Sequence, residues 1–247
     1  MCTVAVFGDD EGGLWLVGNR DEAYWRSAAE PPEVRDSVAI WPRDPDGGGT
    51  WTAVNQFGVA FSLLNNYQGI TGQARDPISR GQIIVQLAQA EDLDEVAAGL
   101  DALDFQRFEP FLLLAASRDG DVQVLEQRWD GQRASRERHH GALMRTSAAF
   151  EFETAELWRR DQWRRSPLSQ NSQTSPRSSI SQAIEGFFTA HHPSSGALSV
   201  CKHTPIASTV SHTQIRVDGD HVWMRHVPNA PCGAAAGVEV VLARQPR

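Results

Sequence analysis

Cysteine, lysine and long apolar runs are scarce in this chain of 247 residues. Its three cysteines, Cys2, Cys201 and Cys232, are too few and too scattered for a disulfide framework, and the odd number favours a reducing compartment. No stretch reaches the roughly 20 apolar residues of a membrane span, and the N-terminus lacks the basic and apolar regions of a signal peptide. We therefore expect a soluble, cytoplasmic protein without membrane insertion.

The charge excludes one large class of partners. The formal net charge is −8 at pH 7, whereas a general nucleic-acid binder needs a basic face. We expect a small-molecule substrate and no nucleic acid, and homo-oligomerisation stays open. Because 40% of the residues are hydrophobic, residues 1–247 can form a single domain with a sizeable core.

Apolar periodicity predicts hairpins and helices in alternating groups. Hairpins are expected at residues 3–17, 51–67 and 111–129, helices at 79–90, 92–103, 150–165 and 179–190, and strands at 197–203, 208–217 and 221–227. A loop rich in Pro, Asp and Gly is expected to end at residues 47–49. Hairpins in place of alternating β-α-β units predict mainly antiparallel sheets covered by helices, an α+β layered domain.

Cys2 stands at the start of the first predicted strand. Cysteine is small enough for the initiator Met1 to be removed, which would place a free α-amine on the same residue as the thiol. An α-amine has an unperturbed pKa of about 7.7–8.0, so it can serve as the base of its own thiol. An isolated Cys at this position is more simply an ordinary buried residue, and its surroundings decide between the two.

Asn19-Arg20-Asp21-Glu22 follows the second predicted strand, where the hairpin returns the chain to its origin. An arginine and a carboxylate there can orient the α-amine and stabilise a thiolate. The alternative is a solvated turn with an exposed ion pair worth about 0–1 kcal/mol. These four residues therefore indicate a catalytic site only in combination with Cys2.

Several short motifs occur together with this pair. They are Met1-Cys2, Asn19-Arg20-Asp21-Glu22, Gly48-Gly49-Thr50-Trp51, Val54-Asn55-Gln56-Phe57-Gly58, Leu64-Asn65-Asn66-Tyr67 and Ala207-Ser208-Thr209-Val210-Ser211. In this combination the chain resembles the NRDE family, also called the transport-and-Golgi-organisation family. It is also similar to the choloylglycine hydrolase and penicillin acylase branch of the N-terminal-nucleophile (Ntn) hydrolases. The resemblance implies a four-layer αββα sandwich of mainly antiparallel sheets.

The same resemblance implies roles for individual residues. Cys2 would be the nucleophile, Arg20 and Asp21 would hold the N-terminal residue, and Asn66 would donate to the oxyanion. Substrate binding is assigned to Asn19, Glu22, Asn65, Tyr67, Thr146 and Ser147. The alternative for Asn65-Asn66 is a turn that satisfies its own backbone.

Two departures from the related hydrolases stand out. Their second oxyanion donor is an Asn, whereas the corresponding segment here offers the hydroxyls of Thr146 and Ser147. Related sequences also commonly carry an arginine where this chain has Ser208, and Arg216 and Arg225 are candidate substitutes.

The C-terminal third is rich in cysteine and histidine, with Cys201, His203, His212, His221, His226 and Cys232. These residue types could hold a metal or haem, but the spacing matches no zinc pattern. We expect neither a metal nor a cofactor. The pairs His139-His140 and His191-His192 are interpreted as loop residues, and the arginines of residues 157–165 as a solvated helix face.

Two functions follow. The first is a cysteine-dependent amidohydrolase or acyltransferase that acts on a small non-peptide amide. The second keeps the fold and uses the pocket for binding, as a non-catalytic carrier or chaperone of a hydrophobic ligand such as haem or an acyl metabolite. Fold alone does not decide between them.

Overall fold

The computed structural model describes residues 2–170 and 177–245, and within these ranges the strands form two antiparallel sheets. The first sheet has the spatial order β10 (Leu143–Ser147), β1 (Cys2–Gly8), β2 (Leu14–Ala23), β11 (Ala207–Val217), β12 (His221–Val227), β13 (Val238–Ala243). The second has the order β3 (Glu30–Arg35), β4 (Ala39–Arg43), β5 (Thr52–Asn55), β6 (Ala60–Asn65), β7 (Phe111–Asp119), β8 (Asp121–Trp129), β9 (Ala134–His140).

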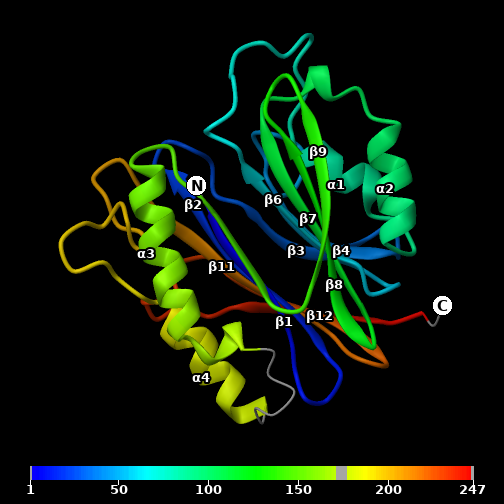
Figure 1. Cartoon of the computed structure of the whole chain (residues 1–247). Helices are drawn as coiled ribbons and strands as arrows, with labels where there is room; N and C mark the ends of the chain where they lie inside the picture. Colours follow the sequence, from blue (N-terminus) through cyan, green and yellow to red (C-terminus); the bar gives the residue numbers. More distant parts are fainter. Residues whose placement is uncertain (1, 171–176, 246–247) are drawn as a thin grey trace.

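Helices cover the outer face of each sheet (Figure 1). The first sheet carries α3 (Phe152–Arg165) and α4 (Arg177–Phe188), and the second carries α1 (Gly81–Leu87) and α2 (Leu93–Asp101). The short 3₁₀ turns η1 (Phe105–Arg107) and η2 (Pro167–Ser169) follow α2 and α3. The layers are therefore α, β, β and α, which confirms the predicted α+β sandwich. None of the described helices combines the length and apolar character needed to cross a membrane.

Alternating side chains build three apolar layers. In β1, Val4 and Val6 belong to the cluster between the sheets, whereas Ala5 and Phe7 pack with α3 and α4 on the outer face. Residues of β7 divide in the same way between the inter-sheet cluster and the cluster under α1 and α2. Because such strands are buried on both faces, they appear in the sequence as continuous apolar runs.

The hairpin predictions at residues 3–17, 51–67 and 111–129 are confirmed by β1 and β2, β5 and β6, and β7 and β8. All four helix predictions are also confirmed. The helix α2 begins where Asp92 caps it, since its carboxylate accepts hydrogen bonds from the backbone N–H groups of Asp94 and Glu95.

Other predictions are wrong. The loop expected before residues 47–49 contains β3 and β4. The sequence did not predict β3 because Pro31 and Pro32 are untypical of strands. The sheet tolerates them because β3 is a mostly exposed edge strand, which needs few backbone hydrogen-bond donors. Residues 197–203 form no strand, because their backbone groups bond to Ala190 and Thr209 outside any ladder. The polar strand β9 was missed, and His139 and His140 lie on it and not in a loop.

We predict that Leu114→Ala lowers the free energy of unfolding by about 2–5 kcal/mol, because Leu114 is fully buried between the sheets. Leu157→Ala is the matched control, since Leu157 is 68% exposed on α3 and its loss should change stability by about 0.5 kcal/mol or less. Chemical denaturation measures both. Equal losses in the two variants would contradict the three-layer core.

Candidate active site

The register of the first sheet places Cys2 between two neighbours. Cys2 lies opposite Arg20 on β2 and opposite Ser147 on β10. Its backbone N–H donates to Ser147 Oγ at 3.1 Å, and the Thr146 hydroxyl donates to its carbonyl at 3.1 Å. Met1 lies outside the described residues. The nitrogen that would become the α-amine after removal of Met1 therefore has a fixed hydroxyl partner.

The Cys2 side chain is half-buried, and the groups around it shift the pKa of its thiol in opposite directions. Burial raises the pKa of the Cys2 thiol, and the negative charge of Asp21 acts in the same direction. The backbone N–H of Asp21 and the positive charge of Arg20 act against this and favour the thiolate. The net result is that the pKa of the Cys2 thiol is raised above its ordinary value.

Asp21 is buried on β2, next to Arg20. One of its carboxylate oxygens accepts a hydrogen bond from the Thr209 hydroxyl at 2.7 Å. Burial raises the pKa of Asp21, while the charges of Arg159 and Lys202 favour its ionised form. The strand β11 has a bulge between Thr209 and Ser211, opposite Asp21 and Arg20. A bulge re-aims side chains, and here it brings Thr209 to the carboxylate.

Arg159 is a buried cation of this site. It is completely buried on α3 and donates hydrogen bonds to the Thr146 hydroxyl at 2.6 Å and to the carbonyl oxygens of Leu198 and Ala197 at 3.1 and 3.3 Å. The prediction of a solvated helix face for residues 157–165 is wrong at this position.

The sequence did contain a signal for Arg159. Ala155, Arg159 and Trp163 follow one another at intervals of four residues, and all three are buried. One stripe of α3 therefore faces the sheet, and the arginine falls on it.

Lys202, the only lysine, is a second buried cation to which the sequence alone gave no role. It is 3% exposed. Its backbone N–H donates to the Thr209 hydroxyl at 2.8 Å, and its carbonyl accepts from the Thr209 N–H at 2.9 Å. Burial lowers the pKa of Lys202, whereas the charge of Asp21 raises it. Thr209 thus links Lys202 to Asp21.

A cavity of about 370 Å³ opens above Cys2. Five of the predicted residues line it: Cys2, Arg20, Asp21, Glu22 and Asn65. The remaining lining is Arg26, Asp44, Gly47, Thr50, Trp51, Leu63, Ile78, Ser79, Arg80, Gly81 and Glu109. This volume lies in the range of small-molecule sites.

Arg20 is locked into the wall of this cavity. Its guanidinium lies 4.4 Å from the centre of the Trp51 ring and forms ion pairs with Glu22 at 3.2 Å and Asp44 at 3.7 Å. Stacking and pairing fix the orientation of this arginine. It lies opposite Cys2 in the register.

Three predicted residues lie elsewhere. Asn66, Thr146 and Ser147 line a neighbouring cavity of about 330 Å³, which shares Asn65 with the first. Asn65 is the last residue of β6 and Asn66 follows the strand; of the two, Asn65 lines the Cys2 cavity. The Asn66 amide donates to the carbonyl of Trp129 at 3.1 Å.

Tyr67 and Asn19 form hydrogen bonds with other groups of the protein. The Tyr67 hydroxyl accepts a hydrogen bond from the Asn65 amide at 2.8 Å. Asn19 is buried, and its amide donates to the carbonyls of Phe188 and Val200 at 2.9 and 3.0 Å. These contacts make Asn19 an anchor for the end of α4.

The two candidate substitute arginines are engaged away from Cys2. Arg216 forms ion pairs with Asp9, Glu11 and Asp218 at the opposite end of the strands. Arg225 pairs with Glu239 on β13 at 3.6 Å. The cations near Asp21 are instead Arg159 and Lys202.

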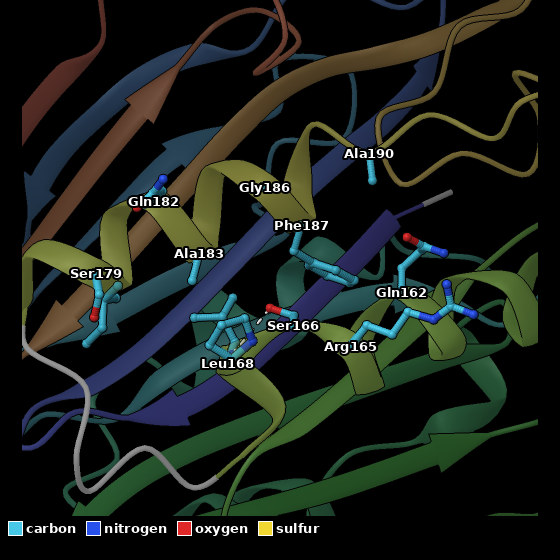
Figure 2. A pocket seen from close by; sticks show the side chains of 12 residues that line it. Gln162, Arg165, Ser166, Leu168, Ser179, Gln182, Ala183, Gly186, Phe187 and Ala190 are labelled. Atoms are coloured by element: carbon cyan, nitrogen blue, oxygen red, sulfur yellow. Dashed lines mark hydrogen bonds between the residues drawn. The ribbon is translucent and has the colours of Figure 1, made fainter.

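A larger cavity, of about 500 Å³, lies between the end of α3, η2 and α4 (Figure 2). Leu168 and Phe187 point into it, and it shares no lining residue with the Cys2 cavity. Its described lining holds no cysteine, histidine or carboxylate. The chemistry-bearing residues are therefore in the smaller cavity.

A comparison with family profiles matches residues 1–215 to Transport and Golgi organisation 2. The chain belongs to this family. A search of curated proteins found no match.

Solved structures show the fold of this family member. A Caenorhabditis elegans N-acylethanolamine-hydrolyzing acid amidase ortholog aligns with TM-score 0.55 and 11% identity, over 87% of this chain and 92% of that one. Two variant structures of conjugated bile acid hydrolase from Clostridium perfringens align over 100% of this chain and 97% of theirs, with 10% identity and TM-scores of 0.55 and 0.56. The chain thus shares the fold of these hydrolases, which confirms the predicted four-layer sandwich.

We predict that Arg159→Met lowers the free energy of unfolding by about 3–5 kcal/mol, because it removes a buried charge that favours ionised Asp21 and leaves buried oxygens without their donor. Arg160→Met is the matched control on the next residue, whose exposed side chain pairs with Glu156; it should change stability by less than about 1 kcal/mol. Urea denaturation compares them, and similar losses would remove Arg159 from the network.

Proposed function

We propose that this protein is a cysteine-dependent Ntn amidohydrolase that acts on a small non-peptide amide, with an acyl group carried transiently on Cys2. The observation that supports this most is the surroundings of Cys2. Its thiol faces a cavity with Arg20 and Asp21, and its nitrogen is bonded to Ser147 Oγ. Nucleophile, base and orienting groups are thereby within one small region.

The first step is activation. Removal of Met1 would turn the Cys2 nitrogen into an α-amine, whose unperturbed pKa is about 7.7–8.0. The Ser147 hydroxyl, 3.1 Å away, orients this amine. The neutral amine takes the thiol proton, and the nearby Asp21 carboxylate balances the resulting ammonium.

The second step is acyl transfer. The Cys2 thiolate attacks the amide carbonyl, and the C–N bond breaks as the ammonium returns its proton to the leaving amine. The product is a thioester on Cys2. A water molecule, deprotonated by the α-amine, then attacks the thioester, which releases the carboxylic acid and restores the thiol. An amine in place of water would give acyl transfer.

We assign the oxyanion donor to Asn65 in place of Asn66. Asn65 lines the Cys2 cavity, whereas Asn66 faces the neighbouring one and donates to Trp129. The Tyr67 hydroxyl, which accepts from the Asn65 amide at 2.8 Å, orients that amide. A donor of this kind is worth about 2.7–4 kcal/mol of transition-state stabilisation in hydrolases.

Arg80 indicates the substrate class. Arg20 and Arg26 are ion-paired with Glu22 and Asp44, whereas Arg80 has no carboxylate within ion-pair distance among the described residues and donates to the carbonyl of Pro110 at 3.0 Å. A cationic group in a cavity wall suits a ligand anion. We therefore expect a small amide that carries a carboxylate.

The similar structures support the same chemistry, since their names describe an acid amidase and a bile acid hydrolase. The carrier alternative fits the Cys2 cavity poorly. Four carboxylates and three arginines line it, and burying these charges against a hydrophobic ligand such as haem is unfavourable. A carrier would instead use the apolar-lined cavity of Figure 2.

We predict that Cys2→Ala abolishes hydrolysis of small N-acyl amino acids while the protein stays folded, because this side chain adds little core volume. A second preparation tests the base: the same chain with a removable tag before Cys2 should be inactive, and cleavage that leaves Cys2 first should restore activity. Turnover assays and circular dichroism make the measurements. Activity in the tagged form or in Cys2→Ala would refute the mechanism and favour the carrier.

We predict that Arg80→Gln raises KM for a carboxylate-bearing amide by roughly 10–100-fold, the loss of one charge-assisted hydrogen bond, and changes kcat less. The control is Arg75→Gln, an exposed position outside the Cys2 cavity. An amide whose carboxylate is replaced by a neutral group should be insensitive to Arg80→Gln. Equal effects on charged and neutral amides would contradict the assignment.

A further inference from the structure

Four side chains with nitrogen or sulfur ligand atoms gather away from the Cys2 cavity. They are His191, Cys201, His203 and Cys232, and their ligand atoms all lie within 4.8 Å of one another. His191 follows α4, Cys201 and His203 precede β11, and Cys232 follows β12. The fold thus brings together four potential metal ligands whose spacing along the sequence does not predict a site.

The separations among Cys201, His203 and Cys232 are close to those of tetrahedral coordination, and the ligand atom of His191 lies within 4.8 Å of all three. The two Sγ atoms are 3.4 Å apart, and His203 Nε2 lies 3.5 Å from Cys201 Sγ and 3.2 Å from Cys232 Sγ. Zn–S bonds of about 2.3 Å and Zn–N bonds of about 2.0–2.1 Å in a tetrahedron require ligand separations of about 3.3–3.8 Å. Both cysteines are free thiols.

We propose that His191, Cys201, His203 and Cys232 form a tetrahedral structural site for a divalent ion of the zinc class. Binding forms two metal–sulfur and two metal–nitrogen bonds, releases the two thiol protons to solvent and involves no oxidation. Two thiolates neutralise the divalent charge, and two imidazoles complete the shell. With four protein ligands the site is closed, which is typical of structural and not of catalytic zinc.

The burial pattern suits entry of an ion from solvent. Cys201 is buried, whereas His191, His203 and Cys232 are exposed. Three ligands can therefore close over an ion that the buried thiolate receives. Thiolate and imidazole ligands select zinc-class ions over magnesium or calcium, which prefer oxygen. Cys232 lies beyond residues 1–215, the part matched by the family profile.

Such an ion would stabilise the segment that contacts Asp21, from a position outside the Cys2 cavity. Lys202 stands between Cys201 and His203, and its backbone pairs with Thr209, whose hydroxyl donates to Asp21 at 2.7 Å. Metal ligands on both sides of Lys202 would fix this segment. The loop after β12 would be tied to the same point through Cys232.

Cobalt titration tests the site directly. Reduced, chelator-treated protein is titrated with Co²⁺, then with Zn²⁺, while absorption and thermal unfolding are recorded. We expect one Co²⁺ per chain, with the thiolate-to-cobalt charge-transfer band and the d–d absorption of tetrahedral cobalt, displacement by Zn²⁺, and a higher Tm with either ion because both bind the folded state.

Variants separate the ligands from other metal-binding groups. Cys232→Ser and His203→Gln change exposed side chains, so they should fold and should weaken cobalt binding by at least about 100-fold, the upper range for loss of mere supporting contacts. Cys2→Ala and His140→Gln, outside the cluster, should bind like the wild type. These readouts do not depend on amide hydrolysis.

Several results would overturn the proposal. One is reduced protein that gives no thiolate-to-cobalt band. Another is unchanged affinity in both Cys232→Ser and His203→Gln. A third is a Cys201–Cys232 disulfide in protein isolated without oxidants, with a reduced form that binds no cobalt.

Discussion

The pairing of β1 with β2 on one side and with β10 on the other determines the rest of the site. This register places Cys2 opposite Arg20 and Ser147, and a shift of one residue would turn every side chain of β1 to the other face. Val4 and Val6 would then leave the core between the sheets. The hydrophobic pattern that folds the strand therefore also fixes the position of Cys2.

Near Cys2, the buried carboxylate of Asp21 is compensated by a hydrogen bond and by opposite charges. An ionised carboxylate such as Asp21 is unfavourable in an apolar interior unless it is paired or hydrogen-bonded. Thr209 supplies a hydrogen bond, and Arg159 and Lys202 supply opposite charge from two separate elements. The network joins α3, β2 and the segment before β11 around one carboxylate, so the stability of the sandwich and the electrostatics of Cys2 are connected.

The sequence alone predicted the structure correctly where residues that are close along the chain are also close in space. The first hairpin alone predicts that Cys2 meets Arg20, and unbroken apolar runs predict the buried strands. Local sequence failed where long-range packing decides: Arg159 was interpreted as solvated, and the sequence did not show which of Asn65 and Asn66 lines the Cys2 cavity. The cysteines and histidines of the proposed metal site come from two loops, residues 189–206 and 228–237, so no spacing rule could assemble them.

Peptide mapping of a single-turnover reaction tests the central claim most directly. Untagged protein is mixed with a stoichiometric amount of activated acyl donor, quenched in acid, digested and analysed by mass spectrometry. The account predicts an N-terminal peptide that begins with Cys2, lacks Met1 and carries one acyl group on sulfur, which hydroxylamine removes. An adduct on Cys201 or Cys232, or acylation of protein that retains Met1, would contradict it.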